Sequence, residues 1–567
     1  MELERCRKVP PVRVPTVLTA NPSPLQWQDW GECLADHPDS RFVSYITNGI
    51  REGFRIGYDY HSHRCKRVKG NMGSAAVHPD VVREYIAKEC AEGRILGPFV
   101  SNTLPNVHIS RFGVIPKRSS SGWRLILDLS SPEGRSVNDG IDPDLCSLSY
   151  VTIDDAARAI LESGPGSLLA KIDIKSAYRI VPVHPEDRSL LGMMWDEGLY
   201  VDAMLPFGLR SAPKIFTALA DALEWIIKRE GVRTLFHYLD DFLIVATPYS
   251  RQCEEDLQSL LAIFDRLHIP VAVEKLEGPA VVLIFLGIGL DTQAMIMRLP
   301  TSKLQELKGL ITQWQGKKFC LKKDLQSLVG KLQHACKVVR PGRTFLRRMF
   351  ELLKGTSRKQ HFIRLNHSFR SDLRWWQLFL ESWNGISMLD DPSWKSASFH
   401  LYSDASGSFG CGAWCEHRWF QYRWPVTFQH QSIAVKELLP IVMACMIWGK
   451  TWSKKAVAVH CDNQAVVEVI NTGYCKDGQL MQLLRCLFFI SSFFGIAVKA
   501  THIAGHRNTG ADAISRNNLH LFFSQVTAAD RTPTPIPTAL LGLIVHHQPD
   551  WTSPVWSQLF TSCLQQV

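Results

Sequence analysis

The alternation of apolar and polar residues predicts regular structure over most of the chain. Residues 78–93 (HPDVVREYIAKECAEG) repeat apolar positions at helical spacing and end at a glycine. This pattern predicts a capped amphipathic helix. Between residues 106 and 290, β-branched runs alternate with helical segments. We therefore expect an α+β domain in this part of the chain.

The second half of the chain begins with a basic helical region from residue 301 to about 385. Its apolar positions on one helix face are Leu325, Leu328, Val329 and Leu332. Strand and helix signals alternate again from residue 399 to about 518. The most apolar stretch there, residues 486–498, is too short to span a bilayer. We expect it to be a buried helix that leads into a strand, and we predict no membrane segment.

Both ends of the chain are rich in proline and show weak periodicity. The opening is expected to be extended or disordered. The pattern therefore divides the chain into an N-terminal extension (1–75, partly disordered), an α+β part (76–295), a helical part (296–392), a second part with alternating strands and helices (393–518) and a proline-rich tail (519–567).

Composition sets broad limits on the class of protein. A chain of 567 residues is too long for one core, so two to four domains are expected. The net charge of +10 suits a nucleic-acid partner but is equally compatible with a solvated basic surface. The 15 cysteines form no CxxC pair, and no secretory signal precedes them. We expect reduced thiols and an intracellular protein, in the cytoplasm or the nucleus.

The stretch His61–Cys65 (HSHRC) contains residue types that bind zinc, but no second ligand pair follows at zinc-finger spacing. A polar loop is the preferred interpretation.

An adjacent pair of aspartates interrupts two apolar, β-prone arms in residues 234–246 (TLFHYLDDFLIVA). The alternative to a functional pair is a surface turn, where adjacent aspartates are common. Uncompensated charge is costly among apolar strands, and a bound cation keeps carboxylates ionised there.

Asp173 also interrupts an apolar strand, in LLAKIDIKSAYRIVPVH (168–184). With Asp240 and Asp241 it supplies the carboxylates from more than one strand that two-metal phosphoryl transfer needs.

A third segment, LPFGLRSAPKIF (205–216), has Pro206 and Gly208 in a turn. Ser211 and Pro213 are placed to open the helix that follows.

Together these three segments resemble reverse transcriptases. The family's Tyr-X-Asp-Asp signature is present as Tyr238-Leu239-Asp240-Asp241. Tyr178 matches the residue whose ring lies under the incoming sugar and excludes ribonucleotides by leaving no room for a 2′-hydroxyl. Where many retroviral enzymes have glutamine in the Leu-Pro-Gln-Gly turn, this chain has Phe207, so we expect its nucleotide contacts to differ there.

The same resemblance implies further nucleotide-binding residues. Lys117 and Arg124, in RFGVIPKRSSSGWRLILDLS, match the two cations of the fingers hairpin that grip the triphosphate. Lys275 falls where the family places a lysine near the triphosphate, and Gly208 belongs to the turn beside the nucleotide. Without the resemblance, the two cations would be interpreted as a solvated basic hairpin.

A second set of acids lies downstream, the first three in segments that indicate a strand, a helix and the end of a strand. Its members are Asp404, Glu437, Asp462 and Asp512. These segments resemble ribonuclease H over about residues 397–518, with His506 at the family's mobile histidine and Asn463 in its Asp-Asn dipeptide. Carboxylates from four elements suit two-metal hydrolysis of a phosphodiester.

The resemblances imply a right-hand polymerase, with fingers and palm at 76–295 and a helical thumb at 296–392, followed by a ribonuclease H domain with a mixed sheet. They imply two Mg²⁺ ions for each active site, with Mn²⁺ as a substitute. The expected partners are an RNA template, a DNA primer, an RNA–DNA hybrid and deoxynucleoside triphosphates. The basic residues of the thumb are expected to follow a phosphate backbone.

The arrangement most resembles DIRS-type retroelements, the tyrosine-recombinase retrotransposons. We find no protease, integrase-finger or recombinase motif, so integration is expected to come from another protein or region. Two alternatives remain open at this stage. One is a non-catalytic nucleic-acid-binding remnant of a decayed element, and the other is a hydrolase in which only the ribonuclease works.

Overall fold

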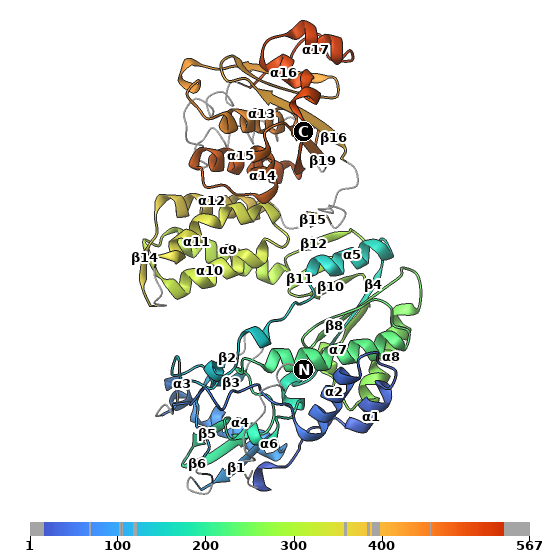
Figure 1. The fold of residues 1–567 in the computed structure, drawn as a ribbon, viewed down its shortest axis with the longest axis vertical. Helices are drawn as coiled ribbons and strands as arrows, with labels where there is room; N and C mark the ends of the chain where they lie inside the picture. Colours follow the sequence, from blue (N-terminus) through green and yellow to red (C-terminus); the bar gives the residue numbers. More distant parts are fainter. Residues whose placement is uncertain are drawn as a thin grey trace. The chain divides into compact units, whose positions relative to one another are not determined.

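The computed structural model describes residues 16–66, 70–100, 104, 106–116, 122–355, 360–382, 386–387, 397–453 and 455–537. The chain forms two compact units (Figure 1). The first contains Met1–Leu286 and Leu290–Ala294, and the second contains Gly287–Gly289 and Met295–Val567.

The first unit mixes helices and strands as the sequence predicted. Its helices are α1 (Trp27–Cys33), α2 (Ser40–Glu52), α3 (Gly73–Val77), α4 (Pro79–Ala91), α5 (Ile153–Ser163), α6 (Pro185–Arg188), α7 (Ala212–Arg229) and α8 (Gln252–Arg266). Its strands are β1 (Ile95–Phe99), β2 (Arg111–Pro116), β3 (Trp123–Asp128), β4 (Leu168–Asp173), β5 (Gly192–Trp195), β6 (Gly198–Asp202), β7 (Leu235–Tyr238), β8 (Asp241–Ala246), β9 (Glu277–Ala280) and β10 (Val282–Phe285). The helix predicted over residues 78–93 is α4.

Three groups of strands organise the first unit. The sheet that carries the first acids has the order β7-β8-β4-β9, and all of its neighbouring strands are antiparallel. A smaller sheet has the order β1-β6-β5, and β2 pairs with β3 in a separate ribbon. One continuous apolar core packs against these elements and includes side chains of α7 and α8.

The N-terminal residues are part of this core, which the sequence pattern had not indicated. The pattern assigned no element before residue 78, whereas the structure places α1 and α2 there, beside α7 and α8 (Figure 1). Asp39 caps α2 by accepting bonds from the backbone of its first turn. The apolar face of α2, including Tyr45, Ile46 and Ile50, is buried in the same core as β4 and β8. Residues 1–15 lie outside the described residues.

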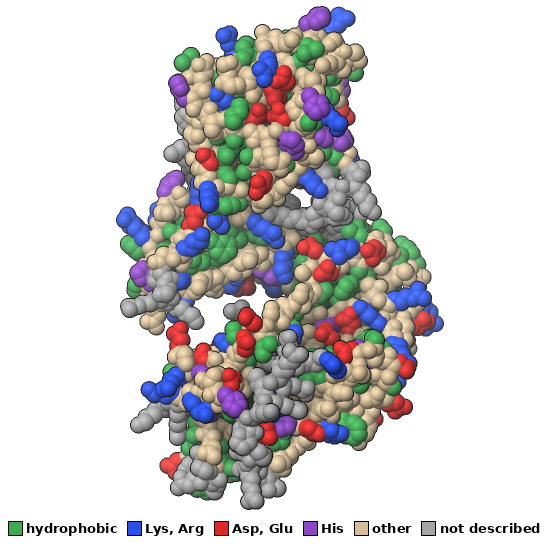
Figure 2. Space-filling view, in the orientation of Figure 1, with side chains coloured by type: hydrophobic (Ala, Val, Ile, Leu, Met, Phe, Trp, Pro, Cys, Tyr) green, Lys and Arg blue, Asp and Glu red, His purple; other side chains and the backbone are tan. Residues whose placement is uncertain are grey.

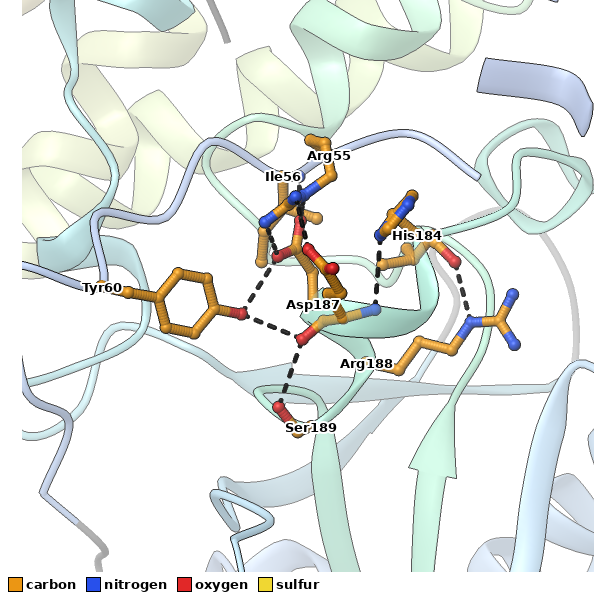
Figure 3. Close-up of polar contacts among 9 residues, drawn as sticks. Arg55, Ile56, Tyr60, His184, Asp187, Arg188 and Ser189 are labelled. Carbon is orange, nitrogen blue, oxygen red and sulfur yellow. Dashed lines mark hydrogen bonds and ion pairs between the residues drawn. The ribbon is translucent and has the colours of Figure 1, made fainter. Parts of the chain in front are cut away.

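Two buried charges fasten this N-terminal region to α6 (Figure 3). The carboxylate of Asp187 accepts bonds from Arg55 Nε (2.9 Å), the backbone N–H of Ile56 (2.9 Å) and the Tyr60 hydroxyl (3.0 Å). The guanidinium of Arg188 donates to the carbonyls of Val183 (2.8 Å) and Leu18 (2.6 Å). Residues far apart in sequence are therefore joined by charge-assisted bonds away from solvent.

The Asp187→Ala variant is expected to be destabilised by about 3 kcal/mol, because Arg55 and Tyr60 lose a buried acceptor. Glu186→Ala is a matched control, since Glu186 pairs with the same Arg55 at 2.7 Å but is 38% exposed. The control should lose less than about 1 kcal/mol. Urea denaturation measures both, and equal losses would show that the burial of Asp187 contributes nothing.

The second unit contains a helical part and a mixed sheet. The helical part consists of α9 (Thr301–Gln315), α10 (Lys322–Ala335), α11 (Arg347–Lys354) and α12 (His367–Ser382), with β13 (Phe319–Leu321) paired to β14 (Phe362–Arg364). The remaining short strands are β11 (Ile288–Asp291), which bridges the two units in sequence, β12 (Ile296–Arg298) and β15 (Ile386–Ser387). The predicted apolar face of α10 is confirmed, because Leu325, Leu328, Val329 and Leu332 are all buried.

The mixed sheet has the order β18-β17-β16-β19-β20. Its strands are β16 (Phe399–Ala405), β17 (Gly410–Cys415), β18 (Arg418–Arg423), β19 (Ala456–Cys461) and β20 (Ala497–His502). The first three are antiparallel, and β16, β19 and β20 are parallel. Its helices are α13 (Ile433–Trp448), α14 (Gln464–Thr472), α15 (Gly478–Phe494), α16 (Thr509–Ser515) and α17 (Leu519–Gln525). Figure 1 shows α13 and α16 on opposite faces of the sheet.

Two smaller predictions are confirmed. The apolar stretch 486–498 is the end of α15 followed by the start of β20. His61–Cys65 lie outside regular helices and strands, with His63 bonded to the carbonyl of Ser136. The cysteines of the described residues are free thiols. No helix within the described ranges is long and apolar enough to cross a membrane.

Candidate active sites

The first candidate site lies where β4 meets the β7–β8 hairpin. Asp173 ends β4 and stands directly opposite Asp241, the first residue of β8. Asp240 occupies the two-residue turn of the hairpin, and its carbonyl accepts a bond from the N–H of Ile174 (3.0 Å). The other turn residue, Leu239, has φ of 54°, a left-handed conformation that costs a non-glycine residue about 1 kcal/mol. Strand register thus brings together the three acids that the sequence predicted.

Electrostatics at this site favour binding of a cation. Burial, followed by repulsion from Asp173, raises the pKa of Asp240. Burial and repulsion from Asp240 and Asp173 raise the pKa of Asp241 to about 6. The ammonium of Lys275 bonds to Asp173 Oδ1 at 2.8 Å and partly offsets this repulsion. Grouped carboxylates with raised pKa values are ligands that a divalent cation would stabilise in the ionised form.

Aromatic side chains form one wall beside these acids. The Tyr178 ring lies between Phe207, at 5.4 Å between centroids, and Phe216, at 5.6 Å. The Arg124 guanidinium lies 5.3 Å from the centre of the Phe207 ring. Burial, followed by the nearby Tyr150 and Asp240, raises the pKa of Tyr178 to about 12. The structure thus joins three predicted nucleotide-binding residues, Arg124, Tyr178 and Phe207, whereas Lys117 lies outside the described residues.

Tyr150 is a residue of this wall that the sequence analysis did not identify. Its ring lies 4.9 Å from that of Tyr238, the first residue of the Tyr-X-Asp-Asp signature. It precedes α5 in an irregular segment, so no periodic pattern could have indicated its place.

Gly208 is required by the geometry of its turn. Its φ is 101°, and a Cβ added there would lie 2.6 Å from the carbonyl oxygen of Leu127 in β3. The turn is held by Asn138, whose amide donates to the Gly208 carbonyl at 2.8 Å and whose oxygen accepts from the N–H of Arg210 at 2.8 Å. A side chain at Gly208 would therefore push the turn away from β3.

The Gly208→Ala variant is expected to lose about 3 kcal/mol of stability and most of any primer extension, because it combines backbone strain with a clash against backbone. Gly134→Ala is the control, since Gly134 also has positive φ (77°) but has open space around it. The control should lose only about 1 kcal/mol. Denaturant unfolding and primer extension measure the two effects, and equal behaviour of the two variants would refute the steric explanation.

The second candidate site lies at one end of the mixed sheet. Asp404 comes from β16, Glu437 from α13 and Asp512 from α16, while Asp462 directly follows β19. The Ser515 hydroxyl donates to Asp404 at 2.5 Å, and Arg516 pairs with Asp512 at 2.6 Å. Figure 2 shows acidic side chains gathered on this part of the second unit.

One potential metal-binding group within the described residues combines two of these acids with a thiol. Ligand atoms of Glu437, Cys461 and Asp462 lie within 4.8 Å of one another. Cys461 ends β19 and its thiol points toward Glu437, with the sulfur 4.0 Å from Oε2. The sequence analysis did not identify Cys461, although it immediately precedes Asp462.

Burial and mutual repulsion also dominate this site. Burial, followed by repulsion from Asp404 and Asp462, raises the pKa of Glu437 to about 9. Burial raises the pKa of Asp404 to about 6, and the Ser515 hydroxyl bond opposes that rise. The structure thus brings the four predicted acids together, and a bound cation would reduce the repulsion among them.

The metal-free Glu437→Gln variant is expected to gain stability relative to the native chain as pH rises. The pKa of Glu437 is about 9 when folded and near 4.5 when unfolded, so ionisation favours the unfolded chain progressively between these values. Thermal unfolding in a chelator at pH 5 and pH 8 measures the effect, and we expect the advantage of the variant to grow by at least about 3 °C. Glu468→Gln, on the exposed side of α14, should show no such growth. An advantage independent of pH would contradict the assignment.

The other residues predicted for this site differ in their surroundings. His506 lies in a short 3-10 turn (Gly505–Arg507) and is exposed. Asn463 caps α14 by accepting from the N–H groups of Ala465 and Val466. Its side-chain oxygen is therefore engaged by the protein itself.

Comparison with protein families finds a match over the part of the chain that holds the first of these sites. Residues 115–290 match the family described as reverse transcriptase (RNA-dependent DNA polymerase). The matched region contains Asp173, Asp240 and Asp241 together with the aromatic wall beside them.

The chain is also similar to a longer protein, the retrovirus-related Pol polyprotein from transposon gypsy of Drosophila melanogaster. The two are 22% identical over 417 residues, which cover 70% of this chain and 36% of that polyprotein. The chain thus spans about a third of the length of the polyprotein it matches.

Two solved structures of foamy viral protease–reverse transcriptase are similar to the chain. The complex with double-stranded DNA is 15% identical, covers 88% of this chain and 84% of its own, and has a TM-score of 0.47. The complex with an RNA/DNA hybrid is 14% identical, covers 87% and 64%, and has a TM-score of 0.45.

Proposed function

We propose that this chain is a retroelement enzyme that copies RNA into DNA with the acids of its reverse transcriptase domain. The observation that carries the proposal is the strand register that sets Asp173 opposite Asp241, with Asp240 in the adjoining turn. Nucleotidyl transfer with two bound cations requires carboxylates from more than one element at one place.

The proposed roles follow from the surroundings of each residue. Asp173, Asp240 and Asp241 would hold two Mg²⁺ ions, or Mn²⁺ in their place, and the bound ions would activate the attacking hydroxyl and neutralise phosphate charge. Tyr178 forms the wall that would exclude a ribose 2′-hydroxyl. Phe207 and Gly208 shape the turn beside it. Lys117, Arg124 and Lys275 are the cations assigned to the triphosphate.

We further propose that the second unit cleaves the RNA strand of RNA–DNA hybrids, as a ribonuclease H. Support comes from Asp404, Glu437, Asp462 and Asp512, which β16, α13, the end of β19 and α16 bring together. They would bind a second pair of Mg²⁺ ions, and the exposed His506 is assigned to proton transfer or product release. Cleavage there would remove the template after copying.

The fold and setting of the enzyme complete the proposal. The first unit would supply fingers and palm, and the helices α9–α12 would supply a thumb that follows a phosphate backbone. The partners would be an RNA template, a DNA primer, the hybrid and deoxynucleoside triphosphates, in the cytoplasm or nucleus. We assign the element to the DIRS type, with a recombinase supplied by another protein or region.

Primer extension tests the polymerase directly. With an RNA template, a DNA primer and Mg²⁺ or Mn²⁺, we expect extension that a chelator stops and that deoxynucleotides support better than ribonucleotides. A chain that binds the primed template but extends it under neither metal would favour a non-catalytic remnant and contradict the proposal.

A further inference from the structure

A buried arginine lies one residue from Tyr178 and is not explained by the proposed metal site. Arg179 is 4% exposed, and its guanidinium lies between acids from two different elements. Its Nη1 donates to both oxygens of Asp202, at 2.7 and 2.8 Å. Its Nε donates to Glu89 of α4 at 3.0 Å. These are charge-assisted bonds in a site that excludes water, where such bonds are strong and their geometry is fixed.

The same guanidinium also reaches the turn that carries Phe207. Arg179 Nη1 lies 3.4 Å from the carbonyl of Leu205, two residues before Phe207. The backbone reinforces this link, because the N–H of Leu205 donates to the carbonyl of Val181 at 3.0 Å. Arg179, the residue next to Tyr178, therefore links the segment of Tyr178 to the backbone of the turn.

The aromatic wall depends on both of these backbones. The Tyr178 and Phe207 rings lie 5.4 Å apart, and each comes from one of the two segments that Arg179 joins. Tyr178 sits in a short 3-10 turn (Ala177–Ile180) that follows Ser176, whose φ is 60°. Such a turn has few backbone bonds of its own, so the position of the Tyr178 ring depends on what anchors the next residue.

A neighbouring arginine provides a contrast. Arg94 pairs with the same Glu89, through Nε at 2.8 Å and Nη2 at 2.6 Å, but its side chain bonds to Glu89 and Glu92 and not to the turn. Arg188, also buried, uses its donors on carbonyls of Val183, Leu18 and Ala20, away from the aromatic wall. Of these three arginines, Arg179 is the one whose side chain reaches the turn that carries Phe207.

We infer that Arg179 is a positioning residue that fixes the aromatic wall of Tyr178 and Phe207 and thereby sets how strictly the enzyme selects the sugar of the incoming nucleotide. This inference rests on the proposed polymerase function. The ligand concerned is a deoxynucleoside triphosphate, whose 2′-carbon would face Tyr178. A shift of the wall by a fraction of an ångström would admit a 2′-hydroxyl and loosen the nucleotide without touching the metal-binding acids.

The test uses the full chain and measures kcat and KM for a deoxynucleotide and for the matching ribonucleotide. Arg179→Lys keeps the charge but loses the planar guanidinium that bonds to Asp202 and Glu89 at the same time. We expect KM for the deoxynucleotide to rise about tenfold and the preference for deoxyribose to fall about tenfold, with a smaller change in kcat. Arg94→Lys, the matched control on the same Glu89, should leave both quantities within about twofold.

If Arg179→Lys does not fold, Asp202→Asn is used in its place. This variant weakens the Arg179–Asp202 ion pair while keeping the side-chain volume. A second measurement separates positioning from general damage. In the background of Tyr178→Val, which removes the wall itself, Arg179→Lys should cause no additional loss of sugar preference.

Three results would overturn the inference while leaving the polymerase proposal intact. The first is that Arg179→Lys and Asp202→Asn are both folded and active, with an unchanged KM and an unchanged preference for deoxyribose. The second is an equal effect of Arg94→Lys. The third is a further, independent loss of preference in the Tyr178→Val background. Failure of the native chain to extend any primer would instead overturn the proposed function itself.

Discussion

The Asp240→Asn variant is expected to lose primer extension by at least about 10³-fold while retaining cleavage of a preformed RNA–DNA hybrid. The substitution keeps the side-chain volume but removes one charged ligand from the group formed with Asp173 and Asp241. Because burial and the neighbouring Asp173 raise the pKa of Asp240, removing its charge relieves repulsion in the metal-free protein. The variant should therefore remain folded, with a melting temperature no lower than that of the native chain.

Asp265→Asn is the control for this experiment, since Asp265 is an exposed acid of α8 in the same unit. It should extend primers within about twofold of the native rate. Extension and hybrid cleavage are measured on the same preparation. Loss of both activities in Asp240→Asn would contradict independent sites, and unchanged extension would contradict the assignment of Asp240.

The reciprocal variant, Asp404→Asn, is expected to lose hybrid cleavage by at least about 10³-fold and to extend primers normally. Asp404 is 5% exposed and carries the Ser515 hydroxyl bond at 2.5 Å, so the amide occupies the same space with one charge fewer. Labelled RNA in a preformed hybrid reports cleavage, and a labelled primer reports extension.

Asp530→Asn is the matched control for Asp404→Asn, because Asp530 is exposed and lies beyond α17 in the same unit. It should cleave within about twofold of the native rate. Normal hybrid cleavage by Asp404→Asn would show that the second acid set is not the nuclease site. Coupled loss of extension would show that the two sites are not separable.

The sequence singled out Asp173 and Asp241 because each interrupts an apolar, β-prone run, and the structure places the two side by side. Antiparallel pairing of those runs sets them opposite each other. The same reasoning missed α2, although its pattern was readable. Asp39 precedes apolar residues at helical spacing, and the structure shows Asp39 as the cap and that face buried. The proline-rich opening had led us to expect weak structure over the whole stretch.

Other features could not be predicted from local pattern at all. The pairing of Arg179 with Glu89 joins residues 90 positions apart, and Ser515 bonds to Asp404 across 111 positions. Long-range pairings of this kind depend on how strands and helices pack in three dimensions. Periodicity reports which face of an element is buried, but not which partner it meets.

A single assay reports on the polymerase and the nuclease together. The native chain is given an RNA template labelled at one end, a DNA primer carrying a second label, deoxynucleoside triphosphates and Mg²⁺. We expect the primer to lengthen and the RNA to shorten in the same reaction, with RNA cleavage confined to the hybrid. A folded chain that binds the primed template but leaves both labels unchanged, with Mg²⁺ and with Mn²⁺, would contradict the proposed function.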